Sequence, residues 1–212
     1  MMANPKAVID EFCTICEAVS TDYDLYVSLF ERDQQTLDLF TKTAPKCFTD
    51  LNRILIDHLI LQFSKISDPA NTGENANLTT NYILKEITWP QDVGEKLGEV
   101  NRRLETFHDY IKAARNKRVA HTDFGAQVEQ LEALGAFPKG ADNQFLRDLQ
   151  EFVNVAYGHF NGGARRSIDG SMSTDTHQLI RALQKSVIFD RCSKCDGDEK
   201  ALAVLNFEDS SE

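Results

Sequence analysis

The residues best suited to chemistry lie close together in "AARNKRVAHTDF", residues 113–124. The stretch holds the pair Arg115 and Asn116, the cations Lys117 and Arg118, and then His121, with no acidic side chain before Asp123. A histidine that titrates near neutral pH can remove the proton of an RNA 2′-hydroxyl. An arginine stays protonated, and its planar fork can bind a phosphate through two hydrogen bonds and stabilise charge on the oxygens. Together these residue types suit cleavage of an RNA phosphodiester.

A long amphipathic helix is expected to position this stretch. The helix is predicted to begin at "WP", residues 89–90, to reach about residue 120, and to carry an apolar seam of Leu97, Val100, Leu104, Phe107, Ile111 and Ala114. In a regular helix Arg118 continues the seam, and Arg115 and His121 lie about 55–65° to either side of it. Because an unpaired buried charge is expensive, this end should open into a cleft, meet carboxylates or face a partner's surface.

Apolar residues at helical spacing predict further helices along the chain. The predicted segments are about 4–32, as one helix or as two separated near residues 20–24, and then 45–66, 77–87, 126–134, 142–160 and 175–191. Segment 45–66 is apolar almost all round and is expected to be buried. Asn77 is the expected N-cap of the next helix, and residues 67–77 and "NGGARRSIDGSMST" are expected loops. The predicted fold class is all-α, a helical bundle of about six to eight helices.

Length and composition bound the domain organisation and the partners. With 212 residues and 42% apolar content, we expect a single helical domain over residues 1–191 and a C-terminal tail over 192–212. The formal net charge of −10 opposes long-range attraction to nucleic acid, so RNA contact needs a local basic patch. Lys112, Lys117 and Arg118 are the candidate RNA-binding residues, although such cations also complement the dipole of a helix C-terminus.

No apolar stretch predicts a signal peptide or a membrane span, so we expect a cytoplasmic protein without membrane contact.

The chain has five cysteines, and they do not suggest a disulfide framework. The pairs Cys13/Cys16 and Cys192/Cys195 have zinc-ligand spacing and could share one ion. The first pair also fits small apolar residues on a helix face.

Two stretches resemble a known family. "RNKRVAH", in which Arg-Asn is followed five residues later by His, resembles the R-x(4–6)-H motif of the HEPN superfamily. "LILQFSKISDPANTGENANLTT", residues 59–80, is similar to the abortive-infection AbiU-like branch of that superfamily, in which a buried helix ends in an S-x-x-x-D-P loop before the next helix starts. The resemblance covers about residues 35–160, and it assigns no role to residues 1–30 or 161–212.

The resemblance implies a helical ribonuclease that acts as a homodimer without metal or cofactor, its two motifs facing a shared cleft. Carried over by position, Arg115 is the motif arginine, Asn116 the polar residue and His121 the motif histidine and general base. The product would carry a 2′,3′-cyclic phosphate. Along a regular helix Arg115 and His121 are separated by about 9 Å, so they converge only if the helix ends or bends, or if a two-fold mate completes the site. Asn116 would lie on the opposite side of that helix.

Other polar residues have simpler explanations. Asp123 fits a turn, and His58 fits a hydrogen-bonded histidine of the core. His108, two turns before Arg115, fits packing but could also line the cleft. The adjacent arginines of "ARRSIDGS" could touch RNA or lie on a solvated surface.

Three classes of function stay open. The first is an RNA endonuclease of the abortive-infection or toxin type, kept inactive by an antitoxin or another regulatory partner. The second is a catalytically silent HEPN-like dimer that binds RNA or a nucleotide. The third is a protein–protein adaptor with an acidic surface. Toxic expression that is rescued by changing His121 would favour the first class, and salt-sensitive RNA binding without cleavage would favour the second.

Overall fold

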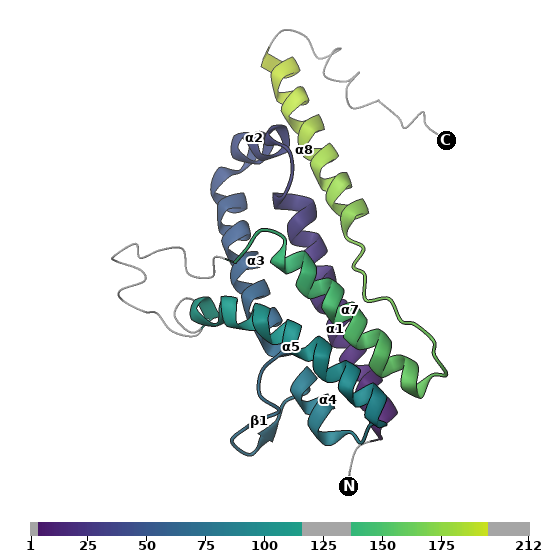
Figure 1. Cartoon of the computed structure of the whole chain (residues 1–212). Coiled ribbons are helices and arrows are strands. Elements are labelled where there is room, and N and C mark those ends of the chain that lie inside the picture. The colour runs from purple at the N-terminus through teal and green to yellow at the C-terminus, as the bar shows by residue number, and fades with distance from the viewer. Residues whose placement is uncertain (1–3, 116–136, 195–212) are drawn as a thin grey trace. The chain divides into compact units, whose positions relative to one another are not determined.

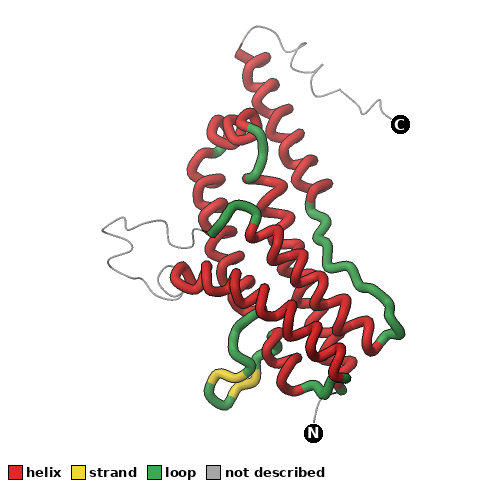
Figure 2. The backbone as a smooth tube through the Cα atoms, viewed as in Figure 1, coloured by secondary structure: helices red, strands yellow, loops and turns green. Residues whose placement is uncertain are grey.

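The computed structural model describes residues 4–115 and 137–194. Within these residues the protein has seven helices and one short hairpin, coloured by type in Figure 2 and labelled in Figure 1. The helices are α1 (Pro5–Phe30), α2 (Gln34–Thr43), α3 (Pro45–Ile66), α4 (Thr80–Glu86), α5 (Gln91–Ala114), α7 (Ala141–Phe160) and α8 (Ser173–Lys194). The hairpin pairs β1 (Asn71–Thr72) with β2 (Asn75–Ala76) in antiparallel register. The all-α prediction is confirmed.

The chain divides into two compact units, and the boundaries fall within α1 and α3. The first unit comprises Met1–Tyr23 and Leu55–Gly170, and the second comprises Asp24–Ile54 and Ser171–Glu212. The first unit contains α4, α5, α7 and the hairpin, and the second contains α2 and α8. A single domain over residues 1–191 stays a prediction.

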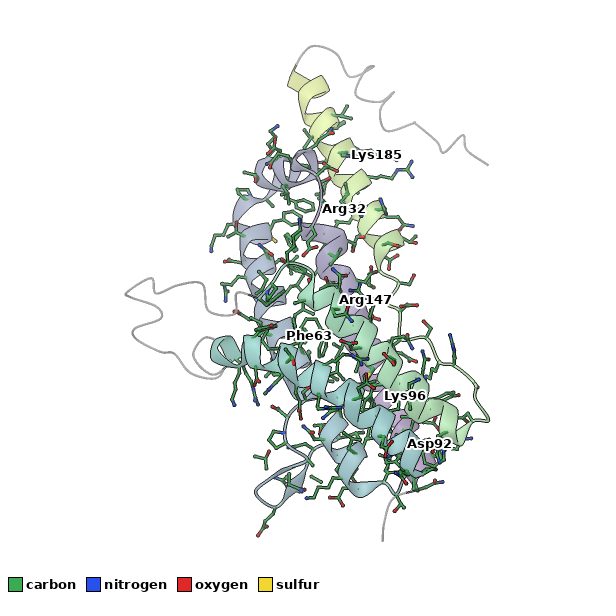
Figure 3. The ribbon with its side chains drawn as sticks, viewed as in Figure 1. Arg32, Phe63, Asp92, Lys96, Arg147 and Lys185 are labelled. Carbon is green, nitrogen blue, oxygen red and sulfur yellow. The ribbon has the colours of Figure 1, made fainter. Side chains whose placement is uncertain are left out.

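The core of the first unit confirms the predicted apolar seam of α5. Its members are buried: Leu97, Val100, Leu104, Phe107 and Ile111 are each at most 3% exposed. Helices α5 and α7 pack along one another, as Figure 1 shows. Phe63 of α3, labelled in Figure 3, lies 5.7 Å from the Phe107 ring and 5.0 Å from the Phe145 ring of α7. Edge and tilted contacts of this kind add to the free energy of burial, so three helices share one aromatic centre.

The α1 helix is continuous through residues 20–24, where the sequence left a break open. Ser20 and Tyr23 are buried there, and the Thr21 hydroxyl donates to the Glu17 carbonyl at 2.8 Å. A hydroxyl that returns its hydrogen bond to the preceding turn is compatible with a helix interior. The polar run therefore does not end the helix.

A loop after α7 is fastened to α1 within the first unit. Arg166 donates through Nε to Glu17 at 2.6 Å, and this hydrogen bond raises the pKa of the guanidinium. Its guanidinium also lies 5.9 Å from the centre of the Tyr157 ring. Gly170 packs so closely that a Cβ would come within 2.6 Å of the Thr21 Cα. Arg166 thus holds the loop against α1 instead of lying on a solvated surface, and RNA contact by "ARRSIDGS" stays a prediction.

The second unit contains α2, a helix that the sequence analysis did not predict. It begins at Gln34 because the Asp33 carboxylate accepts a hydrogen bond from the Thr36 N–H at 2.9 Å, and this bond lowers the pKa of Asp33. Phe40 of α2 stacks on Phe48 with ring centres 4.1 Å apart. A short polar capping signal and an aromatic stack therefore define a helix of only ten residues.

The connection from α3 to α4 corrects two predictions. Thr79, not Asn77, caps α4, since its side chain accepts from the Tyr82 N–H at 3.1 Å. Asn77 instead donates to the Pro69 carbonyl at 3.0 Å and to Thr72, which closes the hairpin within the segment predicted as a loop. Gly73 turns the hairpin with a φ of 61°, a conformation that glycine adopts at little cost.

The predicted burial of α3 holds for its C-terminal part only. Leu59, Ile60, Phe63 and Ile66 are buried, whereas Ile54 is 52% exposed. His58 is not a core residue: its side chain is 39% exposed, and Nε2 lies 2.8 Å from the Asp22 carboxylate. An apolar pattern on all sides overestimates burial where a helix has few neighbours on one face.

Candidate functional site

Arg115 is held by Asp68 at the C-terminal end of α5. Nη1 of Arg115 donates to Oδ1 of Asp68 at 2.7 Å, and Nη2 donates to Oδ2 at 3.0 Å. The two side chains are 29% and 14% exposed. A parallel two-point pair of this kind is stronger and better directed than a single hydrogen bond. Three settings were expected for the cationic end of the α5 seam, namely a cleft, carboxylates or a partner's surface, and Arg115 meets a carboxylate.

The Asp68 segment is fixed by side chains from the first turn of α4. The last carbonyls of a helix have no partner within the helix. Thr80 donates to the Ile66 carbonyl at 3.2 Å, and the Asn81 amide donates to the carbonyls of Ser67 and Asp68 at 3.1 and 3.3 Å. The side chains of α4 therefore fix the backbone that follows the end of α3, including Asp68.

Helix α5 holds this arrangement from the other side. Asn101 donates to Oδ1 of Asn81 at 3.0 Å and to Glu105 at 3.1 Å. The backbone around Asp68 is therefore connected to α5 through two amides in series. Helix α5 therefore carries Arg115 and also fixes the backbone that presents the Asp68 carboxylate.

His108 lies beside the pair. Its Nε2 is 3.7 Å from Oδ1 of Asp68, too far for a hydrogen bond, and its side chain is 13% exposed. Asn101, His108 and Arg115 are seven residues apart and so share one face of α5, next to the face that carries the apolar seam. We call these three residues the polar stripe. The prediction that His108 packs and the alternative that it lines a site are compatible with this position.

Several buried polar atoms around the stripe make no hydrogen bond with any described residue. They are Oγ of Ser64, Oγ of Ser67, Oδ1 of Asn101 and Nε2 of His108. Buried polar atoms are nearly always bonded, so a cluster of exceptions calls for an explanation. Two of these residues, Ser64 and Ser67, belong to the S-x-x-x-D-P stretch, which contains Asp68 and ends in Pro69. This part of the protein has hydrogen-bonding capacity that packing alone does not use.

Most of the predicted motif lies outside the described residues. Asn116, Lys117, Arg118 and His121, with Asp123, fall between the two described ranges. Helix α5 is described to Ala114, with Arg115 as its C-cap, and not to residue 120. Lys112, the remaining predicted RNA-binding residue, is exposed. The structure thus brings Arg115 together with Asp68, which was not expected in the site, and with His108, which was named as a residue that could line the cleft.

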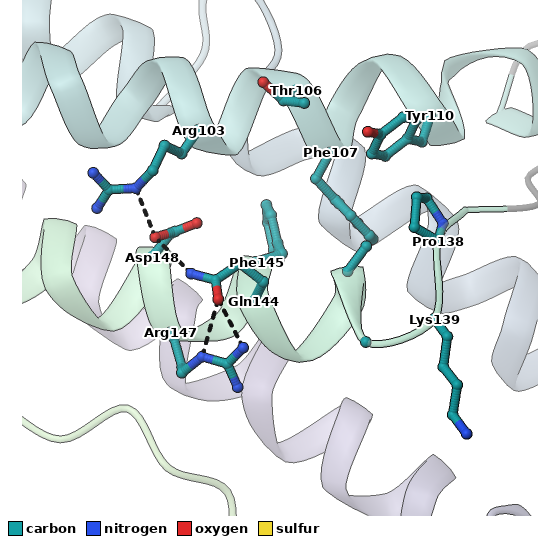
Figure 4. Close-up of a pocket in the computed structure, with 12 residues that line it drawn as sticks. Arg103, Thr106, Phe107, Tyr110, Pro138, Lys139, Gln144, Phe145, Arg147 and Asp148 are labelled. Atoms are coloured by element: carbon teal, nitrogen blue, oxygen red, sulfur yellow. Dashed lines mark hydrogen bonds and ion pairs between the residues drawn. The ribbon is translucent and has the colours of Figure 1, made fainter.

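A second feature, shown in Figure 4, is a groove of about 480 Å³ between α5 and the start of α7. Arg103 donates to Asp148 at 2.8 Å and also pairs with Glu99 and Glu151. Arg147 donates to Oε1 of Gln144 at 2.7 Å. These arginines are engaged with neighbouring side chains. The contacts of Arg103 therefore join α5 to α7, and the Arg147–Gln144 contact lies within α7.

The first cysteine pair belongs to the core. Cys13 and Cys16 are each 0% exposed in α1, and burial raises the pKa of Cys13 to about 11 and that of Cys16 well above its ordinary value. A buried thiol of this kind is a poor metal ligand because the thiolate is disfavoured. Among the described residues no group of three His, Cys, Asp or Glu side chains could hold a metal ion. Whether Cys192 and Cys195 bind zinc involves side chains outside those described.

Comparison with known proteins identifies the class. A HEPN family model, AbiU2, matches the chain over residues 6–186. The chain belongs to this AbiU2 family of HEPN proteins. The match is longer than the 35–160 expected from the sequence resemblance, and it includes α1 and most of α8. No curated protein and no solved structure matches the chain.

In the described ranges, no helix is both long and apolar enough to cross a bilayer.

Proposed function

We propose that this protein is a metal-independent RNA endonuclease of the abortive-infection or toxin type. The observation that carries the proposal is the ion-paired Arg115 at the end of α5 in a chain of the AbiU2 family. An arginine held in a fixed orientation near the surface can bind a scissile phosphate and stabilise the charge that develops during cleavage.

The role of Arg115 follows from the donors that Asp68 leaves free. A guanidinium has five N–H donors in one plane. Asp68 takes one from each Nη group, and Nε donates to no described residue. Because no described residue accepts a hydrogen bond from Nε, we propose that the edge formed by Nε and the adjacent Nη is the second fork, which binds two phosphate oxygens.

Proton transfer is assigned to His121, with Asn116 as the polar residue of the motif. His121 takes the proton of the 2′-hydroxyl, the oxygen attacks the adjacent phosphorus, and the 5′-oxygen leaves, which gives a 2′,3′-cyclic phosphate. Lys112, Lys117 and Arg118 contact the RNA backbone. DNA is spared because it lacks the nucleophile.

The active form is proposed to be a homodimer in the cytoplasm, with the two motifs facing one cleft. A second copy would supply the surface that the cationic end of α5 needs. An antitoxin or another regulatory partner would keep the enzyme inactive in the cell. Light scattering should give twice the chain mass, and a monomer at high concentration would remove the support for a shared cleft.

The deciding experiment is a cleavage time course on single-stranded and structured RNA with the parent, Arg115→Ala and Arg102→Ala. Arg102 lies exposed on the same helix, so its removal matches the loss of charge. We expect the parent and Arg102→Ala to give cyclic phosphate ends, with EDTA present or absent, and Arg115→Ala to be nearly inactive. Equal cleavage by Arg115→Ala, or complete and reversible loss in EDTA, would contradict the proposal.

The second candidate is a catalytically silent dimer that binds RNA or a nucleotide. The observation in its favour is that Asp68 neutralises Arg115, a pair that could serve binding alone. A parent that binds RNA with a steep salt dependence and never cleaves it would support this candidate.

A further inference from the structure

Asp68 lies between the motif arginine and a second residue of the polar stripe. Its carboxylate binds Arg115 at two points, and the same Oδ1 lies 3.7 Å from Nε2 of His108. The carboxylate thus adjoins two members of the polar stripe. We infer that Asp68 is the residue that positions Arg115 for phosphate binding, an inference that rests on the proposed function.

The geometry of the pair favours positioning over blocking. Both bonds use Nη nitrogens, so the carboxylate approaches the guanidinium end-on. An end-on carboxylate fixes the plane of the guanidinium and leaves the edge at Nε open. If Asp68 occupied that edge instead, a phosphate would have to displace it. The observed contacts therefore orient the arginine without covering the fork that a substrate needs.

The carboxylate is itself held in place, which a positioning residue requires. Asn81 binds the carbonyls of Ser67 and Asp68, and Asn101 of α5 binds Asn81. Pro69, which follows Asp68, restricts the backbone of both residues. The segment that presents the carboxylate is therefore constrained from α4, from α5 and by its own sequence.

The neutralised charge of the Asp68–Arg115 pair limits how strongly it attracts a phosphate. Asp68 cancels the charge of Arg115, so the pair attracts a phosphate weakly at long range, in a chain whose net charge is −10. What the pair offers is orientation at contact. Loss of Asp68 should therefore reduce the rate of the bound complex more than it reduces RNA affinity.

The test compares Asp68→Asn and Asp68→Glu with the parent, Arg115→Ala and the control Asp109→Asn. Asp109 is an exposed carboxylate next to His108, so its loss makes the same change in net charge. Rates are measured with enzyme in excess over a labelled RNA, alongside circular dichroism and thermal unfolding. Asp68→Glu retains the charge but moves the carboxylate by one methylene, which separates a need for position from a need for charge.

We expect both Asp68 variants to lower the maximal single-turnover rate about 10- to 100-fold, with the enzyme concentration that gives half of this rate within about threefold of the parent. Asp109→Asn should match the parent. In the Arg115→Ala background, Asp68→Asn should change the residual rate less than twofold, because Asp68 acts through Arg115. If Asp68→Asn does not fold, Asp68→Glu carries the test.

The outcomes separate the two proposals. A parent that does not cleave RNA, or an Arg115→Ala variant that cleaves at the parental rate, overturns the proposed function. If Arg115→Ala is inactive but Asp68→Glu and Asp68→Asn cut at the parental rate, the positioning role alone is overturned. Faster cleavage or tighter RNA binding by Asp68→Asn also overturns it, because Asp68 would then oppose the substrate.

Discussion

Asn101 of α5 donates a hydrogen bond to Asn81 of α4 across 3.0 Å, and Asn81 in turn binds the backbone that presents Asp68. The two asparagines are 20 residues apart in the chain. It connects helix packing to the candidate site, because the same two amides set the path of the segment that holds Arg115.

The first prediction concerns this contact. Asn101→Ala should lower the free energy of unfolding by about 1–2 kcal/mol, since Asn81 loses a partner in a buried setting. It should also lower RNA cleavage, because the Asp68 segment is less constrained. Asn143→Ala, on the exposed side of α7, is the matched control. Urea unfolding and cleavage rates on both variants test the prediction, and equal stability of the two would contradict it.

Arg115→Lys is the second change. Lysine keeps the positive charge but cannot bind the Asp68 carboxylate and a phosphate with two planar forks at once. We expect kcat to fall about tenfold or more while RNA affinity changes little. Steady-state kinetics with separate kcat and KM provides the measurement. A variant with the parental kcat would mean that only the charge of residue 115 matters.

His121→Ala is expected to lower the cleavage rate about 10²–10⁴-fold, the usual effect of removing a positioned general base. RNA affinity and helical content should stay close to those of the parent, since a role in proton transfer is distinct from a role in binding. Cleavage time courses, RNA titration and circular dichroism are measured on the same preparation. A folded variant that cleaves as fast as the parent would remove His121 from the mechanism.

Repeating patterns in the sequence predicted the parts of the fold that depend on burial. The seam of α5 is buried as expected, and the predicted segment 142–160 agrees closely with α7, Ala141–Phe160. Periodicity reports one face of a helix packing on a neighbour, so it works where the core is continuous. It failed for Ile54 and His58, because the pattern of α3 does not indicate how many neighbours each turn has.

The site could be predicted only in part. Arg115 was found from a local motif, whereas its partner Asp68 lies 47 residues earlier and is brought close by the α3–α4 connection. A single sequence does not indicate that two residues so far apart in the chain lie close together in the fold. One signal was present, however: Asn101, His108 and Arg115 recur every seven residues beside the apolar seam. A polar stripe next to a buried seam indicates a polar surface opposite it, and the "SDP" loop supplies that surface.

Cysteine reactivity provides the fourth prediction. At pH 8 the Cys13 thiol, with a pKa raised to about 11, is ionised in only about one molecule in a thousand. Cys13 and Cys16 are also fully buried, whereas Cys47 is exposed. Iodoacetamide followed by peptide mapping should therefore modify Cys47 in the folded protein and reach Cys13 and Cys16 only after unfolding. Modification of all three at one rate would show that α1 does not bury this pair.

The last prediction concerns the ion pair that joins α5 to α7. Asp148 is 5% exposed on its side chain and accepts from Arg103 at 2.8 Å, and this hydrogen bond raises the pKa of the arginine. Arg103→Met removes the counter-charge and leaves a buried carboxylate, which is costly.

The expected loss in the free energy of unfolding is about 2 kcal/mol, less than for a fully buried pair. Two features reduce it: Arg103 is 36% exposed, and Gln144 still donates to Asp148 at 3.1 Å. Arg102→Met, which removes the neighbouring exposed arginine, should cost much less. Chemical unfolding of the two variants gives the comparison. Equal destabilisation would show that Arg103 contributes no more than a surface charge, and that apolar contacts alone hold α5 against α7.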